Sequence, residues 1–279
     1  MKNTNIPLLV QIAKLYYEQG KTQQEIAEIF KFERSRVSRL LLEARKRGIV
    51  QFQIIDPSQK EEMLAFSLKE QFGLQDAVVV NVPEISEDNI KKAIGIFAAQ
   101  YLGSILRHGD VLAVSWGDTV QHTVQNLKPG RQIHLTVVPA IGGSGILTES
   151  YMVNNMAEKL ADHFGGTYQA LYAPAFVDSA DTRDALLKSK DLEPVIRLWN
   201  EATVVLVGIG KRYDRYSRTP NALTQFGQFY FTEKELAEIE EKRAVGDINA
   251  HFFNSAGKEL DVSIHRRTIG MSIGQLKRV

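Results

Sequence analysis

Three short glycine-containing segments hold the residue types that could bind a small polar ligand. The first is Ser115-Trp116-Gly117-Asp118-Thr119, which follows an apolar run and precedes a helical pattern. A glycine turn into a helix start favours anions, because the first amide groups are unpaired and the helix dipole attracts negative charge. The Thr119 hydroxyl can add a donor. Asp118 can cap the helix or accept hydrogen bonds from hydroxyl groups, but its charge opposes a phosphate directly beside it.

The other two segments are IGGSG at 141–145 and GIGK at 208–211. Each follows an apolar run typical of a buried strand, and ligands of parallel sheets bind beyond the carboxyl ends of the strands. Tight turns at these places leave room for a small molecule. A glycine that only turns the chain is the more frequent explanation for any one loop, so each loop alone is weak support for a site.

Several other kinds of chemistry lack the residues that they need. The chain has no cysteine, which excludes disulfides, thiolate metal sites and cysteine nucleophiles. Neither G-x-G-x-x-G nor G-x-x-x-x-G-K-[ST] occurs, which argues against dinucleotide and nucleoside triphosphate sites. The 6 histidines show no metal-binding spacing such as H-x-x-x-H. We therefore expect no catalytic residue, no metal and no cofactor.

A basic block lies near the start of the chain. Residues 1–56 hold 10 Lys/Arg and 6 Asp/Glu, whereas residues 57–279 hold 24 and 27, so a total net charge of +1 combines +4 with −3. The twenty residues 31–50 alone carry +5. A local basic block on a near-neutral chain indicates a module that binds polyanions, although a solvated helix face has the same charge.

The basic block coincides with a pattern of short helices. Thr22-Gln-Gln-Glu25 is a capping box that starts one helix, and a further helix begins near Arg34. The apolar side chains expected on the buried side are Ile26, Ala27, Ile29 and Phe30 of the first of these helices and Val37, Leu40, Leu41 and Ala44 of the second. With a helix over 6–16 before them and an alternating strand over 49–54 after them, these elements predict a winged helix-turn-helix. Arginine can bond guanine edges, and serine or lysine can hold phosphates. The alternative is a three-helix cap that binds no nucleic acid. The residues expected to contact DNA are Gln24, Arg34, Ser35, Arg36, Ser38, Arg39 and Lys46.

The pattern of elements changes at Asp56-Pro57, which sets the predicted domain boundary between 1–56 and 57–279. Beyond it, apolar strands alternate with amphipathic helices, which predicts an α/β domain with a doubly covered parallel sheet. Strands are expected at 76–81, 110–115, 133–140, 167–173 and 203–210. Helices are expected at 58–72, with Leu64, Ala65, Leu68 and Phe72 inward, and at 86–107, 118–127, 150–164, 181–200 and 232–243. Residues 246–253 and 261–264 are expected to flank a turn at 254–257.

No stretch approaches the roughly 18 apolar residues of a membrane span. The first residues do not form a signal peptide either, because Gln11 and Lys14 interrupt the apolar run. We expect a cytoplasmic protein with no membrane partner.

Motifs along nearly the whole chain resemble a known family. The first domain holds QGKTQQEIAEIF and RSRVSRLLLEARKRGIV. The second holds VLAVSWGDTV, VVPAIGG, YAPAFVDSADTRDALL, VVLVGIG, AVGDINAHFFNSAGKEL and RRTIG. Together they resemble the bacterial SorC/DeoR-type sugar-binding transcriptional regulators. The resemblance implies a Rossmann-like effector domain, similar to sugar-phosphate isomerases, that senses a ligand without turning it over.

The resemblance also implies roles for particular residues. Gly117, Asp118 and Thr119 would line the phosphate end of the pocket, with Gly142 and Gly143 beside them. Asp178 and Asp247 would accept hydrogen bonds from sugar hydroxyls, a task that suits carboxylates. The alternative for Asp247 is a turn residue at the start of a strand.

The sequence departs from the family pattern in two places. Some relatives hold their effector through a lysine just before the Gly-Gly pair, where this chain has Ala140 and Ile141, which argues against a covalent imine. Relatives also continue beyond the segment that matches RRTIGMSIGQLKRV, whereas the sequence ends at Val279. Either the sequence is a truncated form, or its pocket is completed differently.

The expected protein is therefore a DNA-binding regulator, most simply a repressor, of a carbohydrate-metabolism operon under the control of a phosphorylated sugar. Helix-turn-helix proteins bind two-fold operators, so we expect a homo-oligomer, a dimer or a tetramer. The competing hypothesis is a sugar-phosphate isomerase or deaminase fused to a DNA-binding module, with Asp118 and Asp247 as candidate acid and base.

Overall fold

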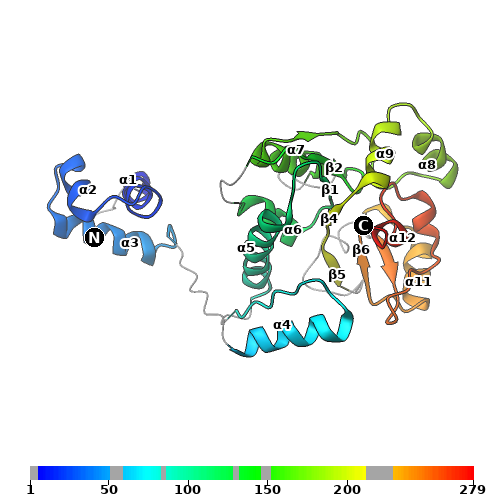
Figure 1. The fold of residues 1–279 in the computed structure, drawn as a ribbon, viewed down its shortest axis with the longest axis horizontal. Helices are drawn as coiled ribbons and strands as arrows, with labels where there is room; N and C mark the ends of the chain where they lie inside the picture. Colours follow the sequence, from blue (N-terminus) through cyan, green and yellow to red (C-terminus); the bar gives the residue numbers. More distant parts are fainter. Residues whose placement is uncertain (1–5, 51–58, 83–85, 128–131, 146–151, 212–228) are drawn as a thin grey trace. The chain divides into compact units, whose positions relative to one another are not determined.

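The computed structural model divides the chain into two compact units, Met1–Lys60 and Glu61–Val279 (Figure 1). The boundary predicted at Asp56-Pro57 lies outside the described residues and stays a prediction. The structure describes residues 6–50, 59–82, 86–127, 132–145, 152–211 and 229–279.

The first unit is helical. Its elements are α1 (Ile6–Ala13), the π-helical segment η1 (Lys14–Glu18), α2 (Gln23–Phe30) and α3 (Arg34–Lys46). The capping box is confirmed, because Thr22 Oγ1 accepts from the Glu25 amide at 3.2 Å and the Glu25 carboxylate accepts from the Thr22 amide at 2.7 Å. Ile29, predicted to be inward, is 54% exposed. The predicted wing strand over 49–54 falls largely on residues outside the described part.

The stripe of α3 is buried as predicted. Val37, Leu40, Leu41 and Ala44 pack against Leu9 and Ile12 of α1 and Ile26 of α2, and together they form the core of this unit. The apolar side chains at i, i+3, i+4 and i+7 share one helix face, so the polar side chains between them are left outside.

The second unit is built on a parallel sheet of four strands in the order β3-β2-β1-β4. In the register, Val111 lies opposite Thr136, and Leu112 lies opposite Val204. The strands are β1 (Val111–Val114), β2 (Thr136–Pro139), β3 (Thr167–Tyr168) and β4 (Val204–Leu206). The α/β class with a parallel sheet is confirmed.

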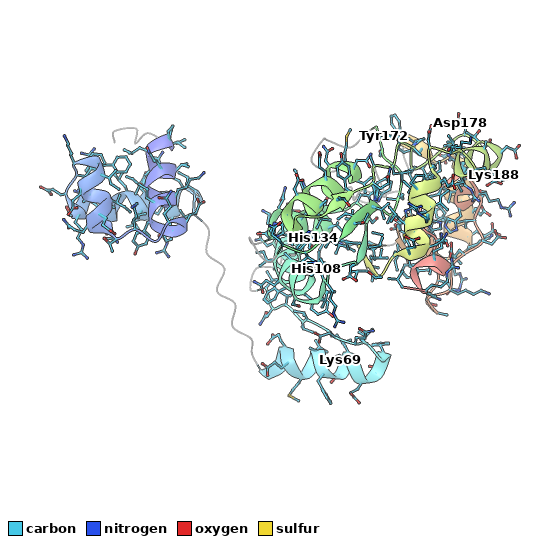
Figure 2. All side chains as sticks on the ribbon, turned by 45° about the horizontal axis from the view of Figure 1, so that its top comes forward. Lys69, His108, His134, Tyr172, Asp178 and Lys188 are labelled. Carbon is cyan, nitrogen blue, oxygen red and sulfur yellow. The ribbon has the colours of Figure 1, made fainter. Side chains whose placement is uncertain are left out.

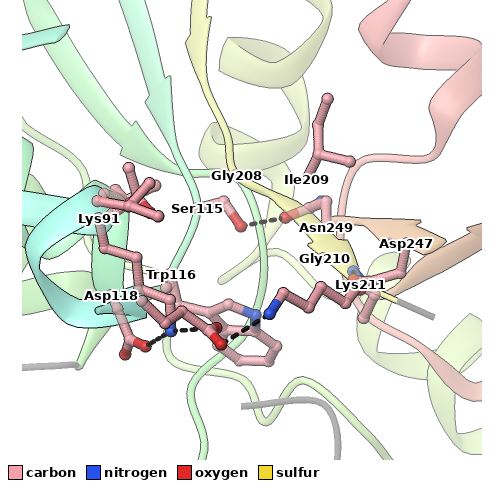
Figure 3. Close-up of a pocket in the computed structure, with 16 residues that line it drawn as sticks. Lys91, Ser115, Trp116, Asp118, Gly208, Ile209, Gly210, Lys211, Asp247 and Asn249 are labelled. Atoms are coloured by element: carbon pink, nitrogen blue, oxygen red, sulfur yellow. Dashed lines mark hydrogen bonds and ion pairs between the residues drawn. The ribbon is translucent and has the colours of Figure 1, made fainter. Parts of the chain in front are cut away.

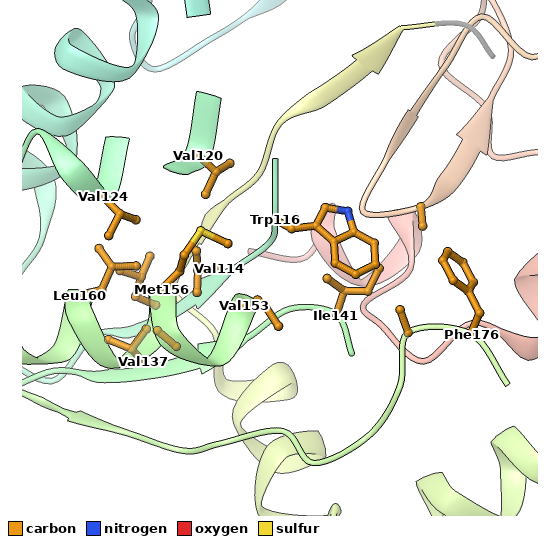
Figure 4. Close-up of a cluster of buried hydrophobic side chains, with 14 of the residues drawn as sticks. Val114, Trp116, Val120, Val124, Val137, Ile141, Val153, Met156, Leu160 and Phe176 are labelled. Carbon is orange, nitrogen blue, oxygen red and sulfur yellow. The ribbon is translucent and has the colours of Figure 1, made fainter. Parts of the chain in front are cut away.

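Helices cover both faces of this sheet. Leu112 and Val114 join a cluster with α6 (Asp118–Gln125) and α7 (Val153–Phe164) (Figure 4). Val111 and Ala113 point the other way, into a cluster with α9 (Glu193–Glu201). Strand side chains alternate between faces, so an unbroken apolar strand such as VLAV is needed between two helical layers. The other helices are α4 (Gln59–Phe72), α5 (Glu87–Ile105), α8 (Ala180–Leu187), α11 (Glu233–Glu241) and α12 (Ile273–Leu276).

A second, antiparallel sheet consists of β5 (Ile209–Lys211), β6 (Gly246–Ile248) and β7 (His251–Phe253). The predicted strand 203–210 is thus divided between two sheets, β4 and β5. The segment 246–253 is a hairpin, with Asn249 and Ala250 at φ of 54° and 59° in its turn. Left-handed residues at both central positions are typical of a two-residue hairpin loop.

Two further expectations were wrong. Residues 76–81 form no strand, since they pair with no neighbour in the described chain. On α4, Leu64 and Phe72 are 49% and 63% exposed, although the helix itself is confirmed. The segment 261–264, expected to follow the turn at 254–257, leads into a 3-10 helix, η3 (Ser263–Arg267).

Candidate functional site

A cavity of about 410 Å³ opens beyond the carboxyl ends of β1 and β4 (Figure 3). Its walls come from α5, from the turn between β1 and α6, from the segment that joins β4 to β5, and from the β6–β7 hairpin. This is the edge of the sheet where parallel α/β folds bind ligands. Segments more than a hundred residues apart in the sequence therefore meet around one space.

The wall formed by the start of α6 is suited to an anion. Gly117 precedes the helix at φ 124°, a conformation that residues with a side chain rarely adopt. The Gly117 carbonyl accepts from the Gln121 amide at 2.8 Å, which closes the first turn. Asp118 and Thr119 line the cavity from this first turn. The opening amides of a helix have no acceptor within the helix, so a ligand can accept from them.

A row of alternating charges lies along one side of the cavity. Lys91 Nζ on α5 lies 2.7 Å from Asp118 Oδ2 and 3.2 Å from Glu87 Oε1. Lys211 Nζ on β5 lies 2.7 Å from Glu87 Oε2. Burial alone would lower the pKa of Lys91, but the hydrogen bonds and charges of Asp118 and Glu87 raise it above its ordinary value. Lys91 is therefore a firmly protonated cation at the cavity wall.

Asp247 provides a buried carboxyl group on the wall formed by the β6–β7 hairpin, where only 8% of the residue is exposed. Its Oδ2 accepts from the Ala250 amide at 3.2 Å. Burial raises the pKa of Asp247 to about 7, an effect that this single hydrogen bond partly offsets. Gly210 faces the carboxyl so closely that an added Cβ would lie 1.8 Å from Asp247 Oδ1. The glycine of the GIGK segment thus makes room for this carboxyl.

Asn249 connects the hairpin to the sheet. Its Oδ1 accepts from Ser115 Oγ at 2.8 Å, and its Nδ2 donates to the Ala140 and Met271 carbonyls at 2.9 and 2.8 Å. Asn249 is 3% exposed and lines the cavity. These bonds use the oxygen and both N–H groups of the side-chain amide and fix the hairpin against the ends of β1 and β2.

The structure brings together four of the seven predicted effector residues, since Gly117, Asp118, Thr119 and Asp247 all line the cavity. Asp178 does not line it; this residue is exposed just ahead of α8, at the edge of the unit (Figure 2). Its predicted role stays a prediction without support from the cavity.

Gly142 and Gly143 lie outside the lining residues as well. The Gly142 amide donates to the Ile269 carbonyl at 2.9 Å, and the Gly143 amide donates to the Ala173 carbonyl at 2.8 Å. An added Cβ at Gly142 would lie 2.5 Å from the Pro174 backbone. This geometry gives Gly142 a packing role, between the end of β2 and the 173–175 segment.

The predicted DNA contacts form an accessible set in the first unit. All seven are exposed, and they comprise Gln24 on α2 together with Arg34, Ser35, Arg36, Ser38, Arg39 and Lys46 on α3. Arg36 lies over the Phe32 ring at 3.9 Å, and Arg39 Nε lies 3.4 Å from the Ser35 carbonyl. These contacts leave both guanidinium groups at the surface.

Several residues of the cavity were not predicted from the sequence, namely Glu87, Lys91, Lys211, Trp116 and Asn249. Lys211 closes the GIGK segment and Trp116 lies inside SWGDT, so both were within motifs already singled out. Lys91 and Glu87 stand on a long amphipathic helix, where charged residues are commonplace. Only the packing of α5 against α6 brings them to the site.

Two negative findings concern the part of the chain that the structure describes. Within it, no three His, Asp or Glu side chains are grouped as metal ligands would be. None of its helices combines the length and the apolar character that crossing a membrane requires.

Comparison with known proteins places the chain. A family model described as "Putative sugar-binding domain" matches residues 57–279. The chain is 32% identical to the deoxyribonucleoside regulator of Bacillus subtilis over 273 residues, which cover 97% of this chain and 84% of that protein. It is 31% identical to the sorbitol operon regulator of Klebsiella pneumoniae over 281 residues, which cover 100% of this chain and 87% of that protein.

The fold agrees with these matches. The crystal structure of the full-length sorbitol operon regulator SorC from Klebsiella pneumoniae aligns with a TM-score of 0.72 and 30% identity, covering 99% of this chain and 87% of that one. These relatives are transcriptional regulators and not enzymes, which removes the alternative of an isomerase or deaminase. The chain belongs to the SorC/DeoR family of sugar-binding transcriptional regulators.

Proposed function

We propose that the second unit binds a phosphorylated sugar and that this effector controls the binding of operator DNA by the first unit. One observation carries the proposal: a single cavity combines a buried carboxyl, Asp247, with a glycine-led helix start and two ammonium groups, Lys91 and Lys211. Carboxylates accept bonds from sugar hydroxyls, whereas helix starts and ammonium groups bind phosphate. A phosphorylated sugar has both kinds of group.

The volume of the cavity suits such a ligand. Small-molecule sites range from about 300 to 1,000 Å³, and this one is about 410 Å³. The cavity is thus near the small end of that range, as a ligand as small as a monosaccharide phosphate requires. We therefore propose that Asp247 accepts hydroxyl bonds while Gly117, Asp118 and Thr119 lie at the phosphate end. The relatives are named for sorbitol and for deoxyribonucleosides, and we propose that this chain also regulates a carbohydrate operon.

On the DNA side, the proposal assigns residues 1–56 to operator binding and residues 57–279 to effector binding and oligomerisation. Seven exposed polar side chains of α2 and α3, with a net charge of +5 over residues 31–50, support the DNA assignment. We propose a cytoplasmic repressor that acts as a homo-oligomer, since helix-turn-helix proteins read two-fold operators in pairs. No metal or cofactor has a part in this proposal.

A thermal-shift panel tests the ligand class. Ribose 5-phosphate, glucose 6-phosphate and fructose 6-phosphate are compared with the three parent sugars and with inorganic phosphate. A ligand present at about 100 times its dissociation constant adds about 2.7 kcal/mol of stability, which raises the melting temperature by several degrees. We expect a phosphorylated sugar to stabilise the wild-type protein more than its parent.

The Asp247→Ala variant is the matched test of the site, with Asp261→Ala as its control because the Asp261 side chain is 83% exposed. The shift should vanish in the first variant and persist in the second. If no phosphorylated sugar raises the melting temperature more than its parent sugar does, the proposed ligand class is contradicted.

A further inference from the structure

The Asp118 carboxylate creates a difficulty for any phosphate at the start of α6. A negative side chain at this position repels the dianion that the helix start attracts. The Lys91 ammonium group balances the Asp118 charge, since Lys91 Nζ lies 2.7 Å from Asp118 Oδ2 (Figure 3). The cation comes from α5, which is 27 residues away in the sequence.

We propose that Lys91 is the cation of the phosphate subsite, held in place by Asp118 and Glu87 until the ligand phosphate arrives as its third partner. The inference rests on the proposed function, since it names the residue that recognises the phosphate. An ammonium group has three donors. In the described residues, two carboxylates accept from Lys91 Nζ, at 2.7 and 3.2 Å, so one N–H is left for a ligand in the cavity that Lys91 lines.

The charges around Lys91 support this role. Asp118, Lys91, Glu87 and Lys211 alternate in sign along the cavity wall, and their formal charges add to zero. A phosphate that approaches this row meets no net negative charge, and each of the two ammonium groups can turn a donor toward it. Asp247 adds less repulsion than an ordinary carboxylate, because burial raises its pKa to about 7.

A purely structural role explains the Lys91 contacts less well. The ion pair could serve to fasten α5 to α6, but these helices are already in close contact at Gly95, where an added Cβ would lie 2.4 Å from His122 Cβ. An ion pair between partly exposed side chains contributes little to stability, and the side chains of Lys91 and Asp118 are 23% and 35% exposed. The contact instead keeps an ammonium group beside the helix start.

The test compares Lys91→Met with Lys91→Arg and with the control Lys92→Met. Lys92 is the next residue on α5, is exposed and lies outside the cavity. Dissociation constants are measured by calorimetry for the three sugar phosphates of the panel and their parent sugars. Loss of one hydrogen bond between an ammonium group and a phosphate should weaken binding of the phosphorylated form about tenfold or more, because bonds between charged groups are stronger than neutral ones.

We expect Lys91→Met to bind the phosphorylated sugar at least about tenfold more weakly than the wild type, and to bind the parent sugar with the same affinity as the wild type. Lys91→Arg should recover most of the affinity, and Lys92→Met should match the wild type. If Lys91→Met does not fold, Lys91→Gln replaces it. Full retention of the preference for the phosphorylated form in Lys91→Met or Lys91→Gln would overturn the inference.

The wild-type measurements distinguish a failure of the proposed function from a failure of the role of Lys91. If the wild type shows no preference for a phosphorylated sugar over its parent, the proposed function fails, and the role of Lys91 fails with it. If the wild type shows the preference and the Lys91 variants keep it, the proposed function stands and only the role of Lys91 is refuted.

Discussion

Replacing Asp247 by asparagine should change how the stability of the protein depends on pH. The carboxyl is 8% exposed, and burial raises its pKa from 3.8 to about 7. Asparagine has nearly the shape of the protonated acid and can still accept from the Ala250 amide, but it cannot ionise. The variant therefore removes one titration while keeping the packing.

The sign follows from proton binding. Between about pH 4 and pH 7 the folded protein keeps the Asp247 proton while the unfolded chain has lost it, so this group makes stability fall as pH rises. The pKa difference of about three units corresponds to at most about 4 kcal/mol, at about 1.4 kcal/mol per unit. Asp247→Asn should thus differ little from the wild type below about pH 4 and exceed its stability by up to that amount at pH 8.

The assay is urea denaturation of both proteins at half-unit steps of pH, and the quantity of interest is the difference between their free energies of unfolding. Taking the difference matters because His251 and His265, whose pKa values burial lowers, make stability rise over part of the same range. Both proteins contain these histidines, so their effect cancels. Asp261→Asn, at an exposed site, is the control and should show a flat difference.

A flat difference in stability between wild type and Asp247→Asn from pH 5 to 8 would contradict a raised pKa for Asp247. It would mean that the carboxyl is well solvated in the folded protein. A difference that grows toward low pH would refute it equally, because it would indicate a carboxylate stabilised in its ionised form.

Three other substitutions test separate parts of the structure. Gly142→Ala places a Cβ 2.5 Å from the Pro174 backbone and should destabilise the second unit by about 1–3 kcal/mol in urea denaturation; an unchanged midpoint would show that the segment yields easily. Arg267→Gln removes the guanidinium that lies 2.7 Å from the buried Glu235 carboxylate and should lower the free energy of unfolding by about 3–5 kcal/mol in the same assay. A decrease below about 1 kcal/mol would show that Glu235 does not need Arg267 as its partner. Arg39→Ala should weaken operator binding by about 1–3 kcal/mol in fluorescence anisotropy, and unchanged affinity would remove Arg39 from the interface.

Local signals in the sequence predicted much of the fold. The capping box at Thr22 and the stripe of α3 need only neighbouring residues, and both are present. The unbroken apolar strands predicted a sheet covered on both faces. The hairpin at 246–253 was missed because its alternation continues across the turn, where Asn249 adopts a left-handed conformation that asparagine tolerates.

The candidate site was predictable only where its residues follow a strand. Gly117 and Asp118 come a few residues after the end of β1, so their place at the sheet edge depends on one turn. Lys91 reaches the same place only because Gly95 lets α5 approach α6 closely, and no local pattern encodes that approach. Leu64 of α4 was predicted to be buried and is exposed, because an apolar stripe on a helix does not specify which element covers it.

Control of DNA binding by a ligand in the Asp247 cavity is tested most directly by operator affinity with and without the effector. A duplex enriched from a random pool by the wild-type protein is titrated, by fluorescence anisotropy, in the presence of the sugar phosphate that stabilises the protein most. For a repressor we expect the sugar phosphate to weaken DNA binding by at least about tenfold, a coupling of about 1.4 kcal/mol. This loss of affinity should be absent in Asp247→Ala and intact in Asp261→Ala. Equal DNA affinity of the wild type with and without a saturating sugar phosphate would contradict it.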